Sequence, residues 1–442
     1  MTNSDPQYDV LVLGGGPAGA TAALVLAREG RRVLLLERTS FPRFHIGESL
    51  LPRNLALLKE LGLESELQKL PKVEKQGAEF LLGHGRDEAS LFWFSELFTD
   101  GETSAFNLER APFDTMLLDA ARDAGAEVRQ ESAVKKILRL EDGRVEVRTD
   151  AGEEVAARYM IDASGQSTVV GKHLGTRKVM EHHRKVACFG HFEHVARRKG
   201  PEGGFIVIVM NDEGWFWMIP LDETRTSVGV VMDVAHAKKV GLPAGEMLQW
   251  AIERCPAVKA RMAAAVLAGN ARTIADFSYR CAPYAGPGYF LAGDAAVFVD
   301  PIFSTGVCMG MMSAVQAARG IQELLRGASP AKVRRRYIRY VQGSTSAFFR
   351  LVDLYYQHSF RELFLSGSGP FHLYEATMAL LAGYVFPKPS FALRWRFKLL
   401  DLLTLMNRFL PVAPRREPFS LLADPSLVPA PLAEPWPSDS AG

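Results

Sequence analysis

YDVLVLGGGPAGATAALVLAREGRRVLLLER, residues 8–38, is the stretch that decides the fold of this chain. Its apolar start, Val10–Leu13, predicts a short buried strand, and the GxGxxG pattern of residues 14–19 predicts a turn into a helix over 17–28. The apolar run Val33–Leu36 predicts the next strand. Together these elements are typical of a βαβ unit that binds a dinucleotide.

Each glycine of the motif has a separate role in such a unit. Gly14 permits the tight turn, Gly16 lets the backbone approach a pyrophosphate, and Gly19 lets the helix lie close to the strand. The helix starts at Pro17 and Ala18, where free amides and the helix dipole favour an anion. These residues are therefore predicted to bind the cofactor.

An acidic residue follows the second strand at the distance that a ribose site needs. Glu37 lies 18 residues after Gly19, where its carboxylate would accept hydrogen bonds from a ribose 2′-OH. An acid here favours an unphosphorylated ribose. A GxGxxG motif alone is also compatible with an ordinary loop, but the flanking strand, helix and acid favour a dinucleotide. The motif does not distinguish FAD from NAD.

The composition indicates one sizeable enzyme. The chain has 442 residues, 48% of them hydrophobic and 23% charged, which is enough for a large core or two domains sharing an interface. A formal charge of +2 provides no general field for nucleic acid. Four cysteines without CxxC or metal-ligand spacing indicate a reducing compartment and no metal site. They are Cys188, Cys255, Cys281 and Cys308.

No targeting or membrane segment is apparent. The first residues, MTNSDPQ, lack a basic and apolar signal pattern. The apolar run Ala376–Phe386 is shorter than the roughly 20 residues that a membrane span needs. We therefore expect a cytoplasmic protein without a transmembrane segment.

The loop after Glu37 is the next candidate site. Residues 41–52, FPRFHIGESLLP, read as a loop because of their proline and glycine content. Loops at the carboxyl ends of parallel strands face the ligand, so Arg43, Glu48 and Ser49 are placed to meet a cofactor. The alternative is a surface loop with a capping serine before a helix over 54–61.

Two basic residues are weaker candidates. Lys75 stands in a charged turn before a strand that ends near Gly83, and taken alone it is an ordinary solvated lysine. Arg110 comes just before a helix whose first turn contains Pro112. It would reach a phosphate or a flavin edge, or else pair with Asp114 or Glu109.

The nucleotide-binding part continues in two later stretches. Residues 159–165, YMIDASG, form a buried strand with a polar end, and residues 288–296 contain a similar strand ending in Gly-Asp. Asp294 is placed there to hydrogen-bond a ribityl or ribose hydroxyl. Gly306 and its neighbours then offer backbone amides at a helix start, which is a natural site for a small anion.

The remaining stretches predict a substrate side and a helical end. Residues 186–234 contain successive β-rich runs, which predict an antiparallel sheet. Trp215 and Trp217 project from one face of their strand, and on local grounds they are core aromatics. The region 344–405 is helical and rich in aromatic residues, which either pack in the core or line the substrate approach. The proline-rich end, 411–442, is expected to be loosely packed.

These stretches carry a resemblance to a known family. The first glycine motif with Glu37, Arg110 before its helix, Asp162–Gly165 and Gly293-Asp294 resemble the FAD-binding pattern of the glutathione-reductase-type monooxygenase superfamily up to about residue 325. Three further features resemble the flavin-dependent halogenases. WFWMIP at 215–220 fits the family's WxWxIP, residues 298–306 fit its FxxPxxSxG, and Lys75 stands where the family keeps a catalytic lysine.

The resemblance implies a fold and a domain order. The fold is α/β, with a Rossmann-like FAD-binding domain similar to para-hydroxybenzoate hydroxylase, an inserted antiparallel substrate domain and a C-terminal helical region. The FAD-binding domain comprises residues 1–80, 106–180 and 276–330, and the substrate side comprises 81–105 and 181–275. The helical region is 331–410, and the proline-rich tail is 411–442.

The resemblance also implies a reaction. FADH2, O2 and chloride or bromide would give hypohalous acid, which Lys75 would hold for attack on the substrate. Ser304, Thr305 and Gly306 would bind halide, Gly306 would also contact the cofactor, Ser49 would lie near the flavin, and Trp215 and Trp217 would shield it from the substrate. A separate flavin reductase is expected, because no second dinucleotide fingerprint appears.

The sequence narrows the branch of the family. Tryptophan halogenases carry a glutamate directly before the Ser-Thr-Gly that corresponds to 304–306, and Phe303 stands here instead. The chain is more similar to phenol and pyrrole halogenases, some of which act on substrates tethered to an acyl or peptidyl carrier protein. The alternatives are an aromatic FAD-dependent monooxygenase or flavin reductase of the same superfamily, and a catalytically inactive FAD-binding homologue.

Overall fold

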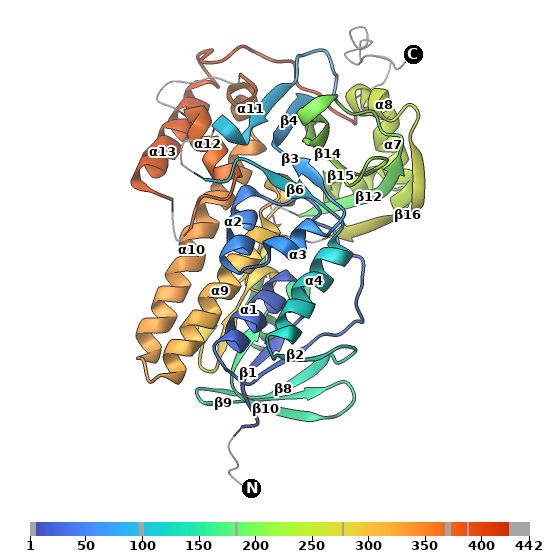
Figure 1. The fold of residues 1–442 in the computed structure, drawn as a ribbon. Coiled ribbons are helices and arrows are strands. Elements are labelled where there is room, and N and C mark those ends of the chain that lie inside the picture. Colours follow the sequence, from blue (N-terminus) through green and yellow to red (C-terminus); the bar gives the residue numbers. More distant parts are fainter. Residues whose placement is uncertain are drawn as a thin grey trace.

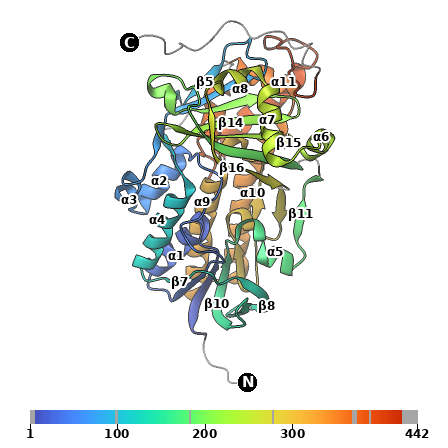
Figure 2. The same ribbon diagram turned by 90° about the vertical axis from the view of Figure 1, so that its right-hand side faces the viewer.

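The computed structural model describes residues 6–96, 101–181, 184–275, 278–366, 373–386 and 389–423 of the chain. A largely parallel sheet lies at the N-terminal end of the molecule, and a second sheet lies at the opposite end (Figure 1 and Figure 2). Helices of the C-terminal part run along both. The predicted fold class is confirmed.

The N-terminal stretch forms the centre of the first sheet. Its strands are β1 (Tyr8–Leu13), β2 (Val33–Leu36), β7 (Glu127–Arg129), β8 (Val134–Glu141), β9 (Arg144–Thr149), β10 (Glu154–Asp162), β18 (Ala285–Gly286) and β19 (Tyr289–Leu291). The order is β18-β19-β10-β1-β2-β7, with β9 and β8 added beside β10. Leu13 pairs in parallel with both Leu36 and Asp162, so three strand ends meet at the glycine turn.

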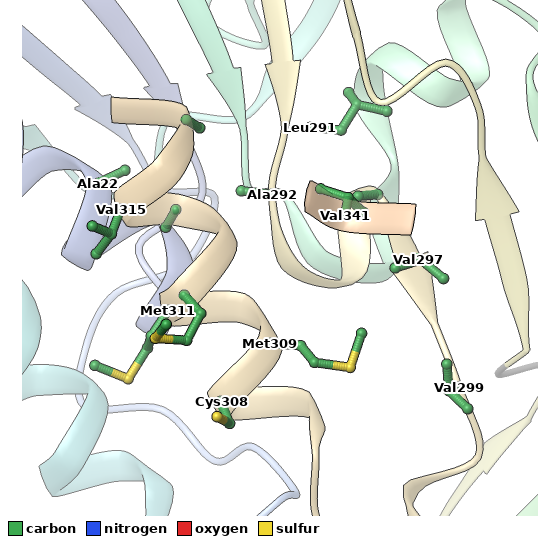
Figure 3. Close-up of a cluster of buried hydrophobic side chains, with 14 of the residues drawn as sticks. Ala22, Leu291, Ala292, Val297, Val299, Cys308, Met309, Met311, Val315 and Val341 are labelled. Carbon is green, nitrogen blue, oxygen red and sulfur yellow. The ribbon is translucent and has the colours of Figure 1, made fainter. Parts of the chain in front are cut away.

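Three helices pack beside this sheet and position its ligand end. They are α1 (Pro17–Arg28), α4 (Arg110–Asp123) and α9 (Gly306–Leu325), and α1 contacts the other two. Small residues allow this close approach. Figure 3 shows Met311 and Val315 of α9 between Ala22 of α1 and the chain at Ala292, directly after β19. The third part of the nucleotide-binding fold is thereby fixed to the first.

The second sheet has seven strands. They are β4 (Gly77–Leu82), β5 (Ser90–Trp93), β12 (Lys185–Glu193), β13 (Ile206–Met210), β14 (Gly214–Pro220), β15 (Arg225–Asp233) and β16 (Val266–Ala275), in the order β16-β12-β15-β14-β13-β4-β5. Neighbours are antiparallel as predicted, apart from the parallel pair β4 and β13. That pair arises because β4 joins the sheet from an earlier part of the chain rather than through a hairpin.

Both faces of the central part of the second sheet are covered, so β13 and β14 are buried on both sides, whereas the edge strand β16 is largely exposed. Along β14, Trp215 and Trp217 face the core shared with the first sheet, whereas Phe216 and Met218 face a second cluster under α7 (Ala244–Arg254) and α8 (Pro256–Arg261). In Figure 1 this sheet lies between α7 and α8 on one side and α11 (His358–Leu365) to α13 (Phe391–Met406) on the other.

The remaining elements connect these layers. They are α2 (Pro52–Glu60), α3 (Glu64–Gln68), α5 (Val169–His173), α6 (Val234–Val240), α10 (Pro330–Tyr355) and α12 (Leu373–Leu381), with the short strands β3 (Val73–Lys75), β6 (Ala105–Asn107), β11 (Arg177–Val179), β17 (Tyr279–Cys281) and β20 (Val297–Phe298). None of the described helices is both long and apolar enough to cross a membrane.

The C-terminal part is helical as predicted, but its end is better packed than expected. Phe419 and Leu421 are buried in the cluster under α7 and α8, and the backbone N–H of Leu421 donates to the Glu213 carboxylate at 2.8 Å. Residues 411–423 are therefore not loosely packed, because two apolar side chains fix them to the second sheet. The rest of the predicted tail, 424–442, lies outside the described residues.

Aromatic residues of the C-terminal helices are largely core residues. Phe348, Tyr355 and Phe360 are fully buried, which favours the core-packing interpretation over the lining of a substrate path.

Candidate active site

The glycine turn has the geometry that a pyrophosphate needs. Gly14 adopts φ +97°, and a Cβ there would lie 2.4 Å from the Ala163 carbonyl oxygen. A Cβ on Gly19 would lie 1.8 Å from the Gly14 carbonyl oxygen. At Gly16, by contrast, a Cβ would meet only the Arg43 guanidinium within 4 Å among the described atoms. The turn is closed on its protein side and open above Gly16, at the N-terminus of α1, so it fits an anion.

Glu37 is fixed at the edge of this turn. Its carboxylate accepts the Gly15 backbone N–H at 2.6 Å and the Thr39 backbone N–H at 2.9 Å. The side chain is buried at the end of β2, beside the three strand ends that meet there. This position is compatible with the predicted ribose contact.

Two arginines converge beside the glycine turn. Arg110, the first residue of α4, donates to both Asp114 carboxylate oxygens at 2.7 and 3.0 Å, so the alternative of a pair with Asp114 is realised. Arg43 Nη1 lies 3.6 Å from Asp114 and makes no hydrogen bond to any described residue, although it is buried. Burial lowers the pKa of Arg43, against the attraction of Asp114. The guanidinium of Arg43 is therefore placed to pair with a phosphate.

Asp294 completes the nucleotide side of the site. A Cβ built on the neighbouring Gly293 would lie 3.2 Å from the Ala18 side chain. This distance shows how closely the third part of the FAD-binding domain approaches α1. Burial raises the pKa of Asp294 to about 7, and nearby Arg110 opposes this increase. A carboxyl group in this state both donates and accepts hydrogen bonds, as a sugar hydroxyl partner requires.

Lys75 differs most from its local prediction. It is the last residue of β3, which pairs with β6, and its side chain is only 2% exposed rather than solvated in a turn. Its Nζ donates to Ser49 Oγ at 2.9 Å and to the Leu50 carbonyl at 3.1 Å. Burial lowers the pKa of Lys75 to about 7. The structure thus joins Lys75 to the loop before α2 and provides an amine of which about half is neutral at pH 7.

The two tryptophans lie together on one face of β14. Their ring centroids are 5.8 Å apart, and Trp217 Nε1 donates to Ser227 Oγ at 3.1 Å. Both rings are buried in the core between the two sheets. They form a continuous aromatic wall, as their shared parity along the strand requires.

The turn before α9 presents the third predicted group. Ser304 adopts a left-handed conformation with φ 56°, Thr305 is the N-cap residue of α9, and Gly306 is its first residue. Space beside Gly306 is open, since no described atom lies within 4 Å of a Cβ built there. The Ser304 N–H donates to the Pro301 carbonyl at 2.9 Å, so the amides of Thr305 and Gly306 are the ones that a small anion at this helix start would use.

Sequence reasoning missed two residues that support this turn. Asp300 caps the short 3-10 helix Pro301–Phe303 by accepting the Ile302 backbone N–H at 3.2 Å, and it also accepts the Tyr356 hydroxyl at 2.6 Å. The Asp-Pro pair was a visible capping signal. Tyr356, at the end of α10, lies 56 residues away, so no local pattern indicates its partner.

Glu48 was expected to meet a cofactor, and it forms a buried ion pair with His191 of β12. Glu48 Oε1 and His191 Nε2 are 2.6 Å apart. Burial lowers the pKa of His191, but the Glu48 carboxylate raises it. The net effect is a raised pKa. The pair connects the loop before α2 to the second sheet, so it fixes Ser49 next to Lys75.

The fold and this site define an FAD-binding protein, and comparisons with known proteins agree. Residues 7–340 match the family described as FAD binding domain. A flavin-dependent halogenase of Armillaria mellea is 34% identical over 72% of this chain, and the chain spans 65% of that protein's own length. A chlorinase of 1H-pyrrole-2-carbonyl peptidyl-carrier protein from Pseudomonas fluorescens is 30% identical over 80% of this chain and 84% of its own.

A solved structure gives the same result. The myxobacterial chondrochloren halogenase is 32% identical and superimposes with a TM-score of 0.74 over 90% of this chain and 97% of its own. The chain belongs to the flavin-dependent halogenases, in a branch other than the tryptophan halogenases, and FAD is its cofactor. The predicted family is confirmed, whereas the roles of individual residues stay predictions.

The glycine turn gives a matched pair of substitutions. Gly14→Ala should lower the free energy of unfolding by about 1–3 kcal/mol, because alanine is strained at φ +97° and its Cβ meets a carbonyl. Gly16→Ala should leave the fold intact and weaken FAD binding about tenfold, because its methyl group points into open space near Arg43. Thermal unfolding and flavin fluorescence titration separate the two. Wild-type FAD affinity in Gly16→Ala would contradict the assignment.

Proposed function

We propose that this protein uses FADH2, O2 and chloride or bromide to halogenate an electron-rich aromatic or activated carbon of a natural-product intermediate. The observation that carries the proposal is Lys75, a buried amine with a pKa near 7 that two hydrogen bonds hold beside the flavin-side loop. A hydroxylase needs no such amine. Burial of a lysine is costly, so its presence calls for a chemical reason.

The cofactor roles follow from the cradle around the glycine turn. Gly14, Gly16, Pro17, Ala18 and Gly19 would hold the pyrophosphate at the start of α1. Glu37 would bind the ribose, Arg43 and Arg110 would face phosphate or flavin, Asp294 a ribityl hydroxyl, and Ser49 and Gly306 the flavin side. Bound FADH2 would supply hypohalous acid from O2 and halide.

Halide binding and shielding fall to two other groups. The amides of Thr305 and Gly306 would hold chloride or bromide at an open helix start, with Ser304 forming the turn before them, because the Ser304 N–H already donates to the Pro301 carbonyl at 2.9 Å. Phe303, packed on Tyr355 with ring centroids 5.9 Å apart, leaves no carboxylate at that point of the turn. Trp215 and Trp217 would keep the substrate away from the flavin and so suppress hydroxylation.

Lys75 would deliver the halogen in one of two ways. As a hydrogen-bond donor, it would polarise hypohalous acid while the aromatic carbon attacks the halogen, giving the aryl halide and water. As a nucleophile, the neutral amine would form an N–halogen bond and release water, and the ring would then take the halogen and return the proton to the amine. Only a lysine with a lowered pKa is neutral often enough for the second route.

Two partners belong to this proposal. The protein would receive FADH2 from a separate flavin reductase, since the chain has a single dinucleotide fingerprint. Its substrate would be tethered to an acyl or peptidyl carrier protein. The name of the Pseudomonas fluorescens relative specifies a carrier-bound pyrrole, which supports this possibility.

A cofactor assay tests the proposed function. The purified protein should bind FAD but consume NADPH only when a flavin reductase is added, and then form halogenated product from electron-rich phenols or pyrroles with chloride or bromide. NADPH oxidation by absorbance and product masses by mass spectrometry provide the measurements. Rapid NADPH turnover by the protein alone, with hydroxylated product, would favour an aromatic monooxygenase instead.

A further inference from the structure

The outward face of α13 is apolar, where a surface helix ordinarily carries polar side chains. Its inward face is held by Leu393 and Leu400, both buried. On the opposite face, Phe391 is 75% and Leu402 is 51% exposed, and Phe409, in the turn just after the helix ends at Met406, is 79% exposed. We call this surface the α13 stripe. Its exposed apolar residues are Phe391, Leu402, Leu405, Met406, Phe409 and Leu410. Several large apolar side chains exposed along one helix and the turn after it mark an interaction site.

The charges around the α13 stripe are positive. Lys398 is exposed and lies four residues before Leu402, so it stands within the stripe, and Arg394 and Arg408 are exposed nearby. The one acidic residue in the sequence 389–412 is Asp401, whose carboxylate accepts the Arg350 Nε at 2.9 Å. Contact between two copies of this face would bring like charges together, whereas an acidic partner would complement them.

Two helix layers, α13 itself and α12, separate the α13 stripe from the proposed catalytic lysine. Leu393 of α13 clusters with two alanines of α12. Ala382, directly after α12, clusters with Phe94, whose ring centroid lies 5.3 Å from Lys75 Nζ. Packed helices are about 8–10 Å apart. A partner on the stripe is therefore close to the place where the halogen would be delivered.

We propose that the α13 stripe docks the carrier protein that presents the substrate. An acidic helical carrier domain would lay an apolar helix face on the stripe, with carboxylates on Lys398, Arg394 and Arg408. The prosthetic arm would then need to reach about 20 Å, past α13 and α12, to Lys75. This inference rests on the proposed carrier-bound substrate. The stripe's location favours a carrier over an anionic membrane, which would have no reason to lie beside Lys75.

Binding titrations test the docking surface. The probe is the phosphopantetheinylated peptidyl-carrier protein on which the Pseudomonas fluorescens relative acts, labelled with a fluorophore and titrated with the FAD-loaded protein. Leu402→Glu and Lys398→Glu should each weaken binding at least tenfold. Val266→Glu, which changes an exposed apolar residue of β16, should leave it unchanged. Equal binding by wild type and Leu402→Glu, or no binding by wild type, would overturn the proposal.

Two further measurements examine other occupants. Flotation with phosphatidylserine vesicles and sedimentation at increasing protein concentration should show neither vesicle binding nor dimers through the stripe. Vesicle binding or dimerisation lost in Leu402→Glu would assign the stripe to that occupant and overturn the carrier proposal.

The binding assay needs neither halide nor O2, so its outcome is separate from the proposed function. If wild type binds the carrier, Leu402→Glu weakens that binding, and wild type forms no halogenated product, then the docking proposal stands and only the proposed halogenation is rejected. If wild type halogenates a free phenol but binds no carrier, then the proposed halogenation stands and only the docking proposal is rejected.

Discussion

Lys75→Ala should lose halogenated product by about 10²–10⁴-fold while keeping FAD binding and O2 consumption from FADH2. Lys75 makes its hydrogen bonds to Ser49 and Leu50 of the loop before α2, not to residues of the glycine turn that would hold the nucleotide. Removing the amine therefore leaves the glycine turn, which would hold the pyrophosphate, intact, and at the flavin side it removes only the hydrogen bond to Ser49. Hypohalous acid would escape, and peroxide or hypohalite would accumulate instead of product.

Graded variants separate a chemical role from a structural one. By the nucleophilic route, Lys75→Arg should be as inactive as alanine, since a guanidinium is not deprotonated in proteins, whereas part of the activity retained by arginine would assign the hydrogen-bond-donor route. Ser49→Ala removes one hydrogen-bond acceptor but keeps the amine, so it should retain part of the activity. Product from mass spectrometry and O2 uptake are measured on the same samples. Substantial product from Lys75→Ala would contradict both the role of the lysine and the proposed delivery route.

The sequence predicted those parts of the site whose constraints are local. Gly14 and Gly19 are required by contacts within one turn and its neighbouring strand, so the GxGxxG spacing identifies them. The pair of Trp215 and Trp217 follows from strand periodicity alone. Arg110 and Asp114 are one helical turn apart, so their ion pair was a visible alternative.

Other features depend on contacts between distant segments. The residues next to Lys75 in the sequence predict a solvated side chain, whereas the pairing of β3 with β6 places it in a buried position. Its candidate catalytic role was therefore indicated by family resemblance and not by local chemistry. Tyr356, directly after α10, donates to Asp300, and Glu48, in the loop before α2, pairs with His191 of the second sheet. Phe419 is buried and fixes the segment after α13, although the proline content of this segment predicted loose packing. No periodicity specifies such partners.

The burial of Lys75 should also be visible as a pH-dependent cost in stability. In the folded protein its pKa is lowered to about 7, whereas an unfolded lysine titrates near about 10.4. The unfolded chain therefore holds this proton more tightly, which destabilises the fold. The cost is present in full below pH 7, decreases as the pH rises toward about 10, and is absent above that.

Lys75→Met should therefore raise the free energy of unfolding at pH 6.5 and lose this advantage at pH 10. The lowered pKa corresponds to at most about 5 kcal/mol, and the lost hydrogen bonds to Ser49 and Leu50 return about 1 kcal/mol each, which leaves a gain of about 2–3 kcal/mol. Denaturant unfolding at both pH values provides the measurement, with Lys136→Met on the exposed side of β8 as control. An equal gain at both pH values would mean that methionine merely packs better, and that the amine carries no buried charge at neutral pH.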